Sequence, residues 1–257
     1  NQEHPKLPIR IHVDGASGSM VAPFVDPDLE WDFRLKNVWS INTSGHKYGL
    51  VYPGIGWVIR RGKEALPEDL IFWVSYLGGE EATMAINFSR SASQIVGQYY
   101  VLMRNGFEGF REIHLRTLDV ARYLAEELKG MGIFDIYEDA SNIPIVCWGL
   151  KDDANVEWSL YDLSDRLRMN GWLVPAYPMP ANLQDVVVQR VVARQDFSMQ
   201  LAIKLVEDVK KEIDTLSKAR FVTGNTQGVI NTGSNHGGRT AVDKGDEVQT
   251  QAKTAQK

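Results

Sequence analysis

Apolar residues spaced three or four positions apart predict two long helices in the middle of the chain. The first helix follows Ser89, which is placed to cap it, and the second runs from Asn105-Gly106 to about Lys129. Glycines at 130 and 132 are expected to end the second helix. We expect both apolar stripes to pack in the core rather than to bind a cofactor; they consist of Ile95, Tyr99, Leu102 and Met103, and of Leu115, Leu118, Ala121, Leu124, Ala125 and Leu128.

Segments with a period of two predict strands on both sides of these helices. The expected strands are 9–13, 57–60, 134–137, 144–150, 172–175 and 186–194, and residues 78–83 are expected to form a flexible polar loop. Two further helices are predicted over 158–169 and 197–217. From about residue 219 onward apolar residues nearly vanish, which predicts a disordered tail.

Size and composition indicate a globular protein with room for a substantial core. The chain has 257 residues, 44% of them apolar and 24% charged, enough for one large domain or two smaller ones. A net charge of −5 argues against nucleic acid or an anionic membrane surface as the main partner. No apolar run approaches the roughly 20 residues that span a bilayer. Because the chain starts at Asn1 without an initiator Met or a signal segment, we expect it to come from within a longer protein.

Cysteine and histidine usage narrows the chemistry further. The single Cys147 excludes an intrachain disulfide framework and suits a reducing compartment, so we expect a cytoplasmic protein. Its apolar surroundings favour an inert core thiol. The five histidines are scattered without carboxylate or thiol companions at ligand spacing, and no metal site is predicted.

The segment Ser44–Gly49, here called the lysine loop, is the strongest candidate for chemistry. Lys47 stands between His46 and Tyr48, and the flanking glycines allow a tight turn and close approach to another group. An apolar, glycine-punctuated run follows the loop. A lysine held in such surroundings can act as an amine nucleophile toward a carbonyl group. The local sequence equally allows a loop lysine that forms only an ion pair.

Two more charged residues follow strand-like segments. Asp14 ends the first strand and precedes a run of small residues, which is where open α/β sheets contact ligands, although an Asp there can also simply cap a turn. Arg190 lies in a valine-rich strand and is a candidate clamp for a carboxylate, because the guanidinium fork matches that group. Arg194 is more easily explained by an ion pair with Asp196. Ser89 fits either a helix cap or an anion site.

Taken together, these features resemble the pyridoxal-5′-phosphate-dependent group II decarboxylases of fold type I, and within them the glutamate decarboxylase branch. The resemblance extends from about residue 12 to 217. The His-Lys pair alone indicates only the wider group, whereas Trp-Asp-Phe-Arg-Leu and Asn-Phe-Ser-Arg are more specific to that branch. The matching segments are 12–18 (HVDGASG), 22–24 (APF), 31–35 (WDFRL), 44–49 (SGHKYG), 76–79 (YLGG), 87–90 (NFSR) and 160–168 (LYDLSDRLR).

The resemblance implies an α/β fold of the aspartate-aminotransferase type. Residues 1–112 would be the C-terminal part of the large, cofactor-binding domain with a mostly parallel sheet, residues 113–218 a small α+β C-terminal domain, and 219–257 a disordered tail. The family's chains are considerably longer at the N-terminal end. That missing part holds the residue that stacks on the cofactor ring and the groups that recognise the substrate's γ-carboxylate.

The resemblance also implies roles for individual residues. Lys47 would bond the aldehyde of pyridoxal 5′-phosphate, Asp14 would pair with its ring nitrogen, and His46 would contact the cofactor or take part in proton transfer. Arg190 would bind the substrate's α-carboxylate. The remaining cofactor contacts would come from Ala16 and Ser44, and from Phe88 and Ser89, which reach the phosphate of a neighbouring subunit.

The implied activity is α-decarboxylation of L-glutamate to 4-aminobutanoate and CO₂ by a homodimer or larger homo-oligomer with shared sites. A related decarboxylase with another amino-acid substrate stays open, as does a catalytically inert segment. The tail lacks a basic, Trp-containing segment, so regulation by calmodulin is not expected.

Overall fold

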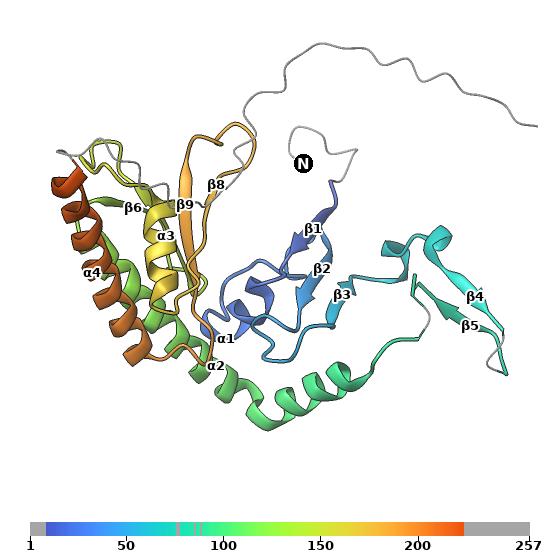
Figure 1. The fold of residues 1–257 in the computed structure, drawn as a ribbon. Helices are drawn as coiled ribbons and strands as arrows, with labels where there is room; N and C mark the ends of the chain where they lie inside the picture. Colours follow the sequence, from blue (N-terminus) through green and yellow to red (C-terminus); the bar gives the residue numbers. More distant parts are fainter. Residues whose placement is uncertain (1–8, 76–77, 85, 88, 224–257) are drawn as a thin grey trace, which may run out of the picture. The chain divides into compact units, whose positions relative to one another are not determined.

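The computed structural model describes residues 9–75, 78–84, 86–87 and 89–223, and contacts group the chain up to Ala219 into one unit. Its first sheet has three strands in the order β1-β2-β3 (Figure 1). Strand β1 (Ile11–Asp14) runs parallel to β2 (Val38–Ser44), and β2 is antiparallel to β3 (Gly56–Arg60). The parallel pair therefore ends at one edge of the sheet, where the segments after both strands meet.

Short elements connect these strands and follow them. A 3₁₀ turn, η1 (Gly18–Met20), and the single-turn helix α1 (Ala22–Val25) lie between β1 and β2. After β3 come the turns η2 (Lys63–Ala65) and η3 (Glu68–Leu70), then β4 (Phe72–Val74) and β5 (Glu81–Thr83). The prediction of a polar loop over 78–83 was wrong for its second half, because residues 81–83 pair antiparallel with 72–74.

Helix α2 (Ser93–Gly130) contains both predicted helices, joined at a kink. The kink is at Gly106, whose φ of 59° and ψ of −165° are not helical and suit a residue without a side chain. The prediction that Ser89 caps this helix was wrong, because the helix begins only at Ser93 and its N-cap, Ala92, offers no side-chain hydrogen bond. The proposed domain boundary at 112/113 lies inside α2, and the division into two lobes stays a prediction.

The second sheet is antiparallel throughout, in the order β6-β7-β9-β8. Its strands are β6 (Phe134–Asp139), β7 (Ile145–Leu150), β8 (Ala176–Pro178) and β9 (Val187–Val192), with helices α3 (Leu160–Met169) and α4 (Met199–Thr223). The strand predicted over 172–175 was wrong by a few residues. Side chains replace a strand partner there: the carbonyl of Val174 accepts from Ser164 Oγ at 2.7 Å and from Gln189 Nε2 at 3.1 Å.

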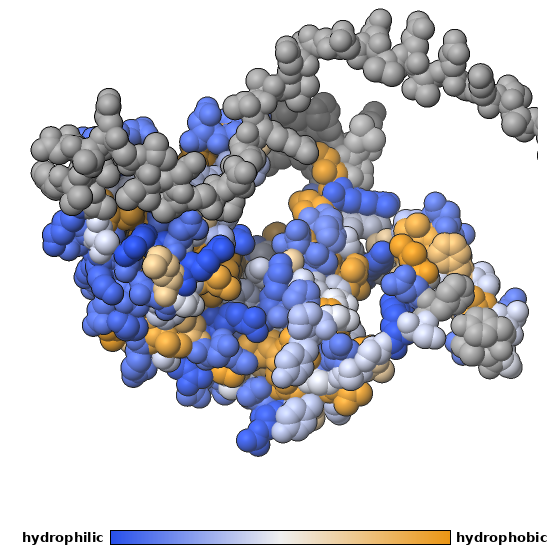
Figure 2. All heavy atoms as spheres, in the orientation of Figure 1, coloured by the Kyte–Doolittle hydropathy of each residue, from blue (hydrophilic) through white to orange (hydrophobic). Residues whose placement is uncertain are grey.

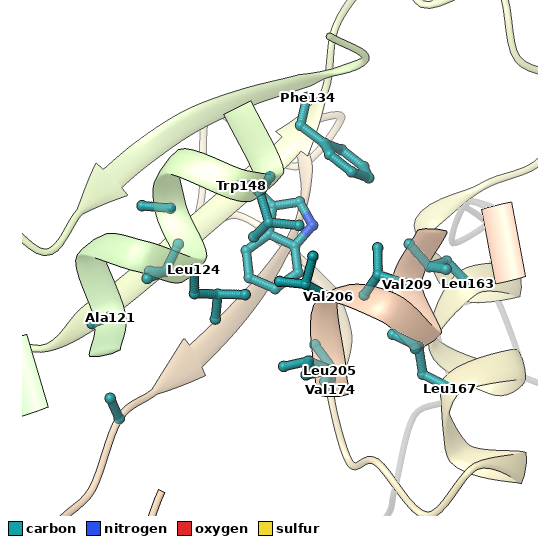
Figure 3. Packing of buried hydrophobic residues seen from close by; sticks show 14 of the residues in the cluster. Ala121, Leu124, Phe134, Trp148, Leu163, Leu167, Val174, Leu205, Val206 and Val209 are labelled. Carbon is teal, nitrogen blue, oxygen red and sulfur yellow. The ribbon is translucent and has the colours of Figure 1, made fainter. Parts of the chain in front are cut away.

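The main core lies between the second half of α2, this sheet, α3 and α4 (Figure 3). Trp148 and Phe134 meet edge to face with ring centroids 6.4 Å apart, and both are almost fully buried. The predicted stripe of the second helix is confirmed for its buried members Leu118, Ala121, Leu124, Ala125 and Leu128. Helix α4 continues to Thr223, past the predicted end at Ser217.

The stripe of the first helix does not pack in this core. Ile95, Tyr99, Leu102 and Met103 are 51%, 67%, 40% and 68% exposed, so the prediction that they are core residues was wrong for the described chain. Figure 2 shows hydrophobic patches on the visible face. The periodicity marks a face that favours burial, but the described residues provide nothing that covers it. In the part of the chain that the structure describes, no helix is both long and apolar enough to cross a membrane.

Candidate active site

The lysine loop follows directly from the end of β2. The backbone N–H of Lys47 donates to the carbonyl of Ser44 at 3.1 Å, which closes a turn. The N–H of Ser44 donates in turn to the carbonyl of Ala16 at 3.2 Å. Since Ala16 comes just after β1, the segments that leave the two parallel strands are hydrogen-bonded to each other. The ends of the two parallel strands therefore bring together Asp14, Ala16, Ser44 and Lys47.

Asp14 is held as an ionised carboxylate at this edge. The backbone N–H of Ala16, whose nitrogen lies 3.1 Å from Asp14 Oδ1, lowers the pKa of Asp14, and the Asn42 side chain and the positive charge of Lys47 lower it further. Asn42 stands opposite Asp14 in the β1–β2 pair, and its Oδ1 accepts from the N–H of Gly15 at 2.9 Å. The loop after β1 is thus fixed from both sides, and Asp14 remains exposed and charged.

A pocket of about 340 Å³ brings the lysine loop together with β7 and β9. His46, Lys47 and Tyr48 line it from the loop, and Arg190 and Arg194 line it from β9 and the residues beyond it. The Lys47 side chain is exposed toward this space. The lining contains three basic side chains, Lys47, Arg190 and Arg194, and no Asp or Glu, which makes the pocket attractive for an anion.

Asp14 lies outside that lining and contributes instead to a second pocket of about 490 Å³. The loop after β1 borders both spaces, since Ser17 lines the lysine pocket while Gly18 and Ser19 line the other. Lys47 and Asp14 therefore lie in two pockets that are separated by the loop after β1.

Histidine and tyrosine fix the lysine loop through their own partners. His46 Nδ1 donates to the carbonyl of Ile55 at 3.3 Å, so that in the neutral tautomer with this bond Nε2 is the acceptor nitrogen. The hydroxyl of Tyr48, a residue only 4% exposed, donates to the carbonyl of Pro144 at 3.4 Å. Burial raises the pKa of Tyr48 to about 12 although the charges of Arg190 and Arg194 oppose the shift. Tyr48 thus joins the lysine loop to the start of β7.

Sequence reasoning missed Tyr48 and also Gln98, a buried residue of α2. Gln98 Nε2 donates to the carbonyl of Gly49 at 2.8 Å from a position 49 residues later in the chain. The glutamine stands between Ile95 and Tyr99 of the first apolar stripe, and that polar interruption is the only signal in the sequence.

The other predicted site residues have mixed outcomes. Arg190 and Arg194 are both exposed at the pocket, so neither guanidinium group is buried in the strand. The expected ion pair between Arg194 and Asp196 is absent from the described residues. Ser89 is exposed on the segment before α2 and contacts neither pocket. Phe88 lies outside the described residues.

Known proteins resemble this chain in both sequence and fold. Residues 4–151, more than half of the chain, match the pyridoxal-dependent decarboxylase conserved domain. The chain is 60% identical over 219 residues to glutamate decarboxylase beta of Listeria innocua, covering 85% of this chain and 47% of that protein. It is 61% identical over 214 residues to glutamate decarboxylase of Lactococcus lactis subsp. cremoris, covering 83% of this chain and 46% of that protein.

Solved structures agree with these matches. The structure of Lactobacillus brevis glutamate decarboxylase has a TM-score of 0.79 and 55% identity, covering 84% of this chain and 49% of that one. Tryptophan decarboxylase of Catharanthus roseus, at 17% identity and a TM-score of 0.67 over 84% of this chain and 46% of its own, shares the fold. The predicted α/β fold type is confirmed.

The chain spans about half the length of the curated relatives it matches. The resemblance found in the motifs around Asp14 and Lys47 is likewise confirmed by the domain match. On this basis the chain belongs to the pyridoxal-dependent decarboxylase family.

Proposed function

We propose that the full-length protein containing this chain is a glutamate decarboxylase that converts L-glutamate to 4-aminobutanoate and CO₂ with pyridoxal 5′-phosphate. The observation that carries the proposal is the meeting of Lys47, His46 and Arg190 at one pocket, with the Asp14 carboxylate at the neighbouring strand end. The 60% identity to a protein named glutamate decarboxylase beta supports the choice of substrate.

The residues present fit one side of a pyridoxal phosphate site. An exposed lysine amine is available to bond an aldehyde, and a carboxylate that hydrogen bonds keep ionised can hold a proton on a pyridine nitrogen. When bound, the cofactor supplies an electron sink for the pair of electrons left by departing CO₂. Asp14 would maintain that capacity through its negative charge, and Lys47 would hold the cofactor through its aldehyde.

The positive pocket suits the α-carboxylate of an amino-acid substrate. Arg190 presents a guanidinium group that can bind the α-carboxylate in a bidentate manner and orient the bond to be broken. Arg194 and Lys47 add further positive charge. His46 is next to the lysine in the chain and also lines the pocket. The 60% identity to a protein named glutamate decarboxylase beta makes a related decarboxylase with an aromatic substrate the less favoured alternative.

We also infer a homodimer or larger homo-oligomer in the cytoplasm. The exposed apolar stripe of α2 supports burial by further protein, and the free thiol of Cys147 suits a reducing compartment. Ser89, together with Phe88, is proposed to reach a neighbouring subunit's cofactor phosphate, and Ala16 and Ser44 to contact the cofactor from the sheet edge. By themselves, these 257 residues are proposed to be inert.

The test compares Lys47→Ala with Lys36→Ala in the full-length protein. Lys36 is another exposed lysine, remote from the pocket lining. We expect Lys47→Ala to abolish CO₂ release from L-glutamate and the absorbance band of bound cofactor, while Lys36→Ala keeps both. Full turnover by Lys47→Ala would refute the proposal. A panel that includes L-tyrosine tests the substrate class, and cofactor titration of the 257-residue chain tests its inertness.

A further inference from the structure

One buried carboxamide, that of Gln98, hydrogen-bonds helix α2 to the lysine loop. Gln98 is only 1% exposed, and its Nε2 donates to the carbonyl of Gly49 at 2.8 Å. Gly49 closes the loop that carries Lys47. A buried carbonyl without a partner is costly, so the conformation of this loop depends on the donor that α2 supplies.

The carboxamide oxygen of Gln98 lies against both glycines of the loop. A Cβ added at Gly45 would overlap Gln98 Oε1. One added at Gly49 would stand 2.8 Å from the same atom and 2.5 Å from the carbonyl oxygen of Gly45. Oε1 itself is buried and has no hydrogen-bond partner among the described residues. The two glycines and the glutamine therefore form one fitted contact, in which Gln98 fills the space beside Gly45 while the loop's own backbone also excludes a side chain at Gly49.

A second glutamine one turn earlier provides a natural comparison. Gln94 Nε2 donates to the carbonyl of Pro53 at 3.2 Å, four residues beyond Gly49. This contact is exposed to solvent, where water can replace the donor. The same helix face thus makes one buried and one exposed hydrogen bond to the same stretch of chain.

We propose that Gln98 is a positioning residue that sets the conformation of the lysine loop and thereby the direction in which Lys47 enters its pocket. The consequence for catalysis rests on the proposed function, but the control of the loop does not. The amide fills the role because it combines a donor for Gly49 with a small, flat oxygen against Gly45. A side chain of similar length without a donor leaves the Gly49 carbonyl unpaired.

The experiment uses Gln98→Met and Gln94→Met in the full-length protein. In the cofactor-free state, hydrogen exchange of a peptide covering residues 44–50 should become roughly tenfold faster in Gln98→Met. It should stay within about twofold of the parent in Gln94→Met. In the cofactor-loaded state, kcat should fall by at least about tenfold in Gln98→Met. KM should change by less than about threefold, because the carboxylate-binding Arg190 lies on β9.

Gln98→Glu gives a readout that a general loss of packing would not produce. A protonated glutamic acid can donate its O–H to the Gly49 carbonyl, whereas the carboxylate cannot. Both quantities are compared with the parent protein at the same pH. As the pH is lowered from about 7 to about 5, the exchange rate of residues 44–50 and kcat should therefore both return toward the parent values. This variant also decides the question if Gln98→Met does not fold.

Three results would overturn the inference: unchanged exchange of residues 44–50 in Gln98→Met, equal effects of Gln98→Met and Gln94→Met, or a Gln98→Glu deficit that does not depend on pH. Failure of the proposed function looks different. There, Lys47→Ala would keep its turnover, while faster exchange in Gln98→Met would still support the role of Gln98 in holding the loop.

Discussion

His114 should make the folded protein less stable as the pH falls below about 6.5. The residue lies on α2 with 0% exposure, among the rings of Phe24, Phe110 and Tyr48 at centroid distances of 5.8, 5.7 and 6.0 Å. Neither ring nitrogen reaches a partner with hydrogen-bond geometry in the described residues. Burial lowers the pKa of His114 from 6.5 to about 4, with the backbone of Met20 opposing the shift in part.

The size of the effect follows from this pKa. The pKa of about 4 in the folded protein lies about 2.5 below the ordinary pKa of 6.5. A pKa difference of one between two states corresponds to about 1.36 kcal/mol. The histidine alone therefore removes about 3 kcal/mol of folding free energy between pH 6.5 and pH 4. The sign is fixed because the unfolded state takes up the proton first. The contribution of neutral His114 to stability is complete above pH 6.5, and it is lost as the pH falls from 6.5 to the pKa of about 4 in the folded protein.

The assay is urea unfolding of the cofactor-free full-length protein at a series of pH values. His114→Leu should show a shallower loss of stability between about pH 6.5 and pH 4 than the parent protein. The exposed His12 provides the control, and His12→Gln should keep the parent slope. Carboxylates that titrate in the same range contribute equally to all three proteins, so they cancel in the comparison. Identical slopes for His114→Leu and the parent would refute the reasoning.

Three further changes test the contacts of helix α3 and of the lysine loop. Arg166→Leu should lower the free energy of unfolding by about 2 kcal/mol in urea, because Arg166 Nε donates at 2.7 Å to Glu212, a carboxylate only 2% exposed. Ser159→Ala should cost about 1 kcal/mol in the same assay, since Ser159 forms the capping box of α3. Gly45→Ala should weaken cofactor retention, measured by absorbance after dialysis, because its Cβ would overlap Gln98 Oε1; unchanged retention would contradict the fitted contact.

The candidate site residues Asp14 and Lys47 could be found in the sequence because a local pattern marks each of them. Asp14 ends an alternating segment, and the lysine loop lies between glycines, so local pattern marks both positions. The strand that leads into the lysine loop, β2, was not predicted. Strands that run parallel bring such ends to one edge, and the hydrogen bond between Ser44 and Ala16 follows from that arrangement. Only the resemblance of the surrounding motifs to a family turned these positions into a cofactor hypothesis.

What local pattern could not supply was the set of contacts between distant segments. Tyr48 donates to a carbonyl 96 residues away, and Gln98 reaches back 49 residues to the lysine loop. A buried tyrosine or glutamine has the same local sequence signature as an exposed one. The strand near residue 174 was misplaced for a similar reason, since side chains of Ser164 and Gln189 occupy the carbonyl that a strand partner would use.

The two halves of α2 show the limit of periodicity most directly. Both halves carry apolar residues at helical spacing, yet Leu124 is fully buried whereas Tyr99 is 67% exposed. Hydrophobic spacing records that a helix face gains free energy when covered, and it contains no information about which surface covers it. The second half finds its cover within 257 residues, in β6, β7 and α4. The first half places Gln98 under the lysine loop on one side, and its apolar side stays open along the chain that the structure describes.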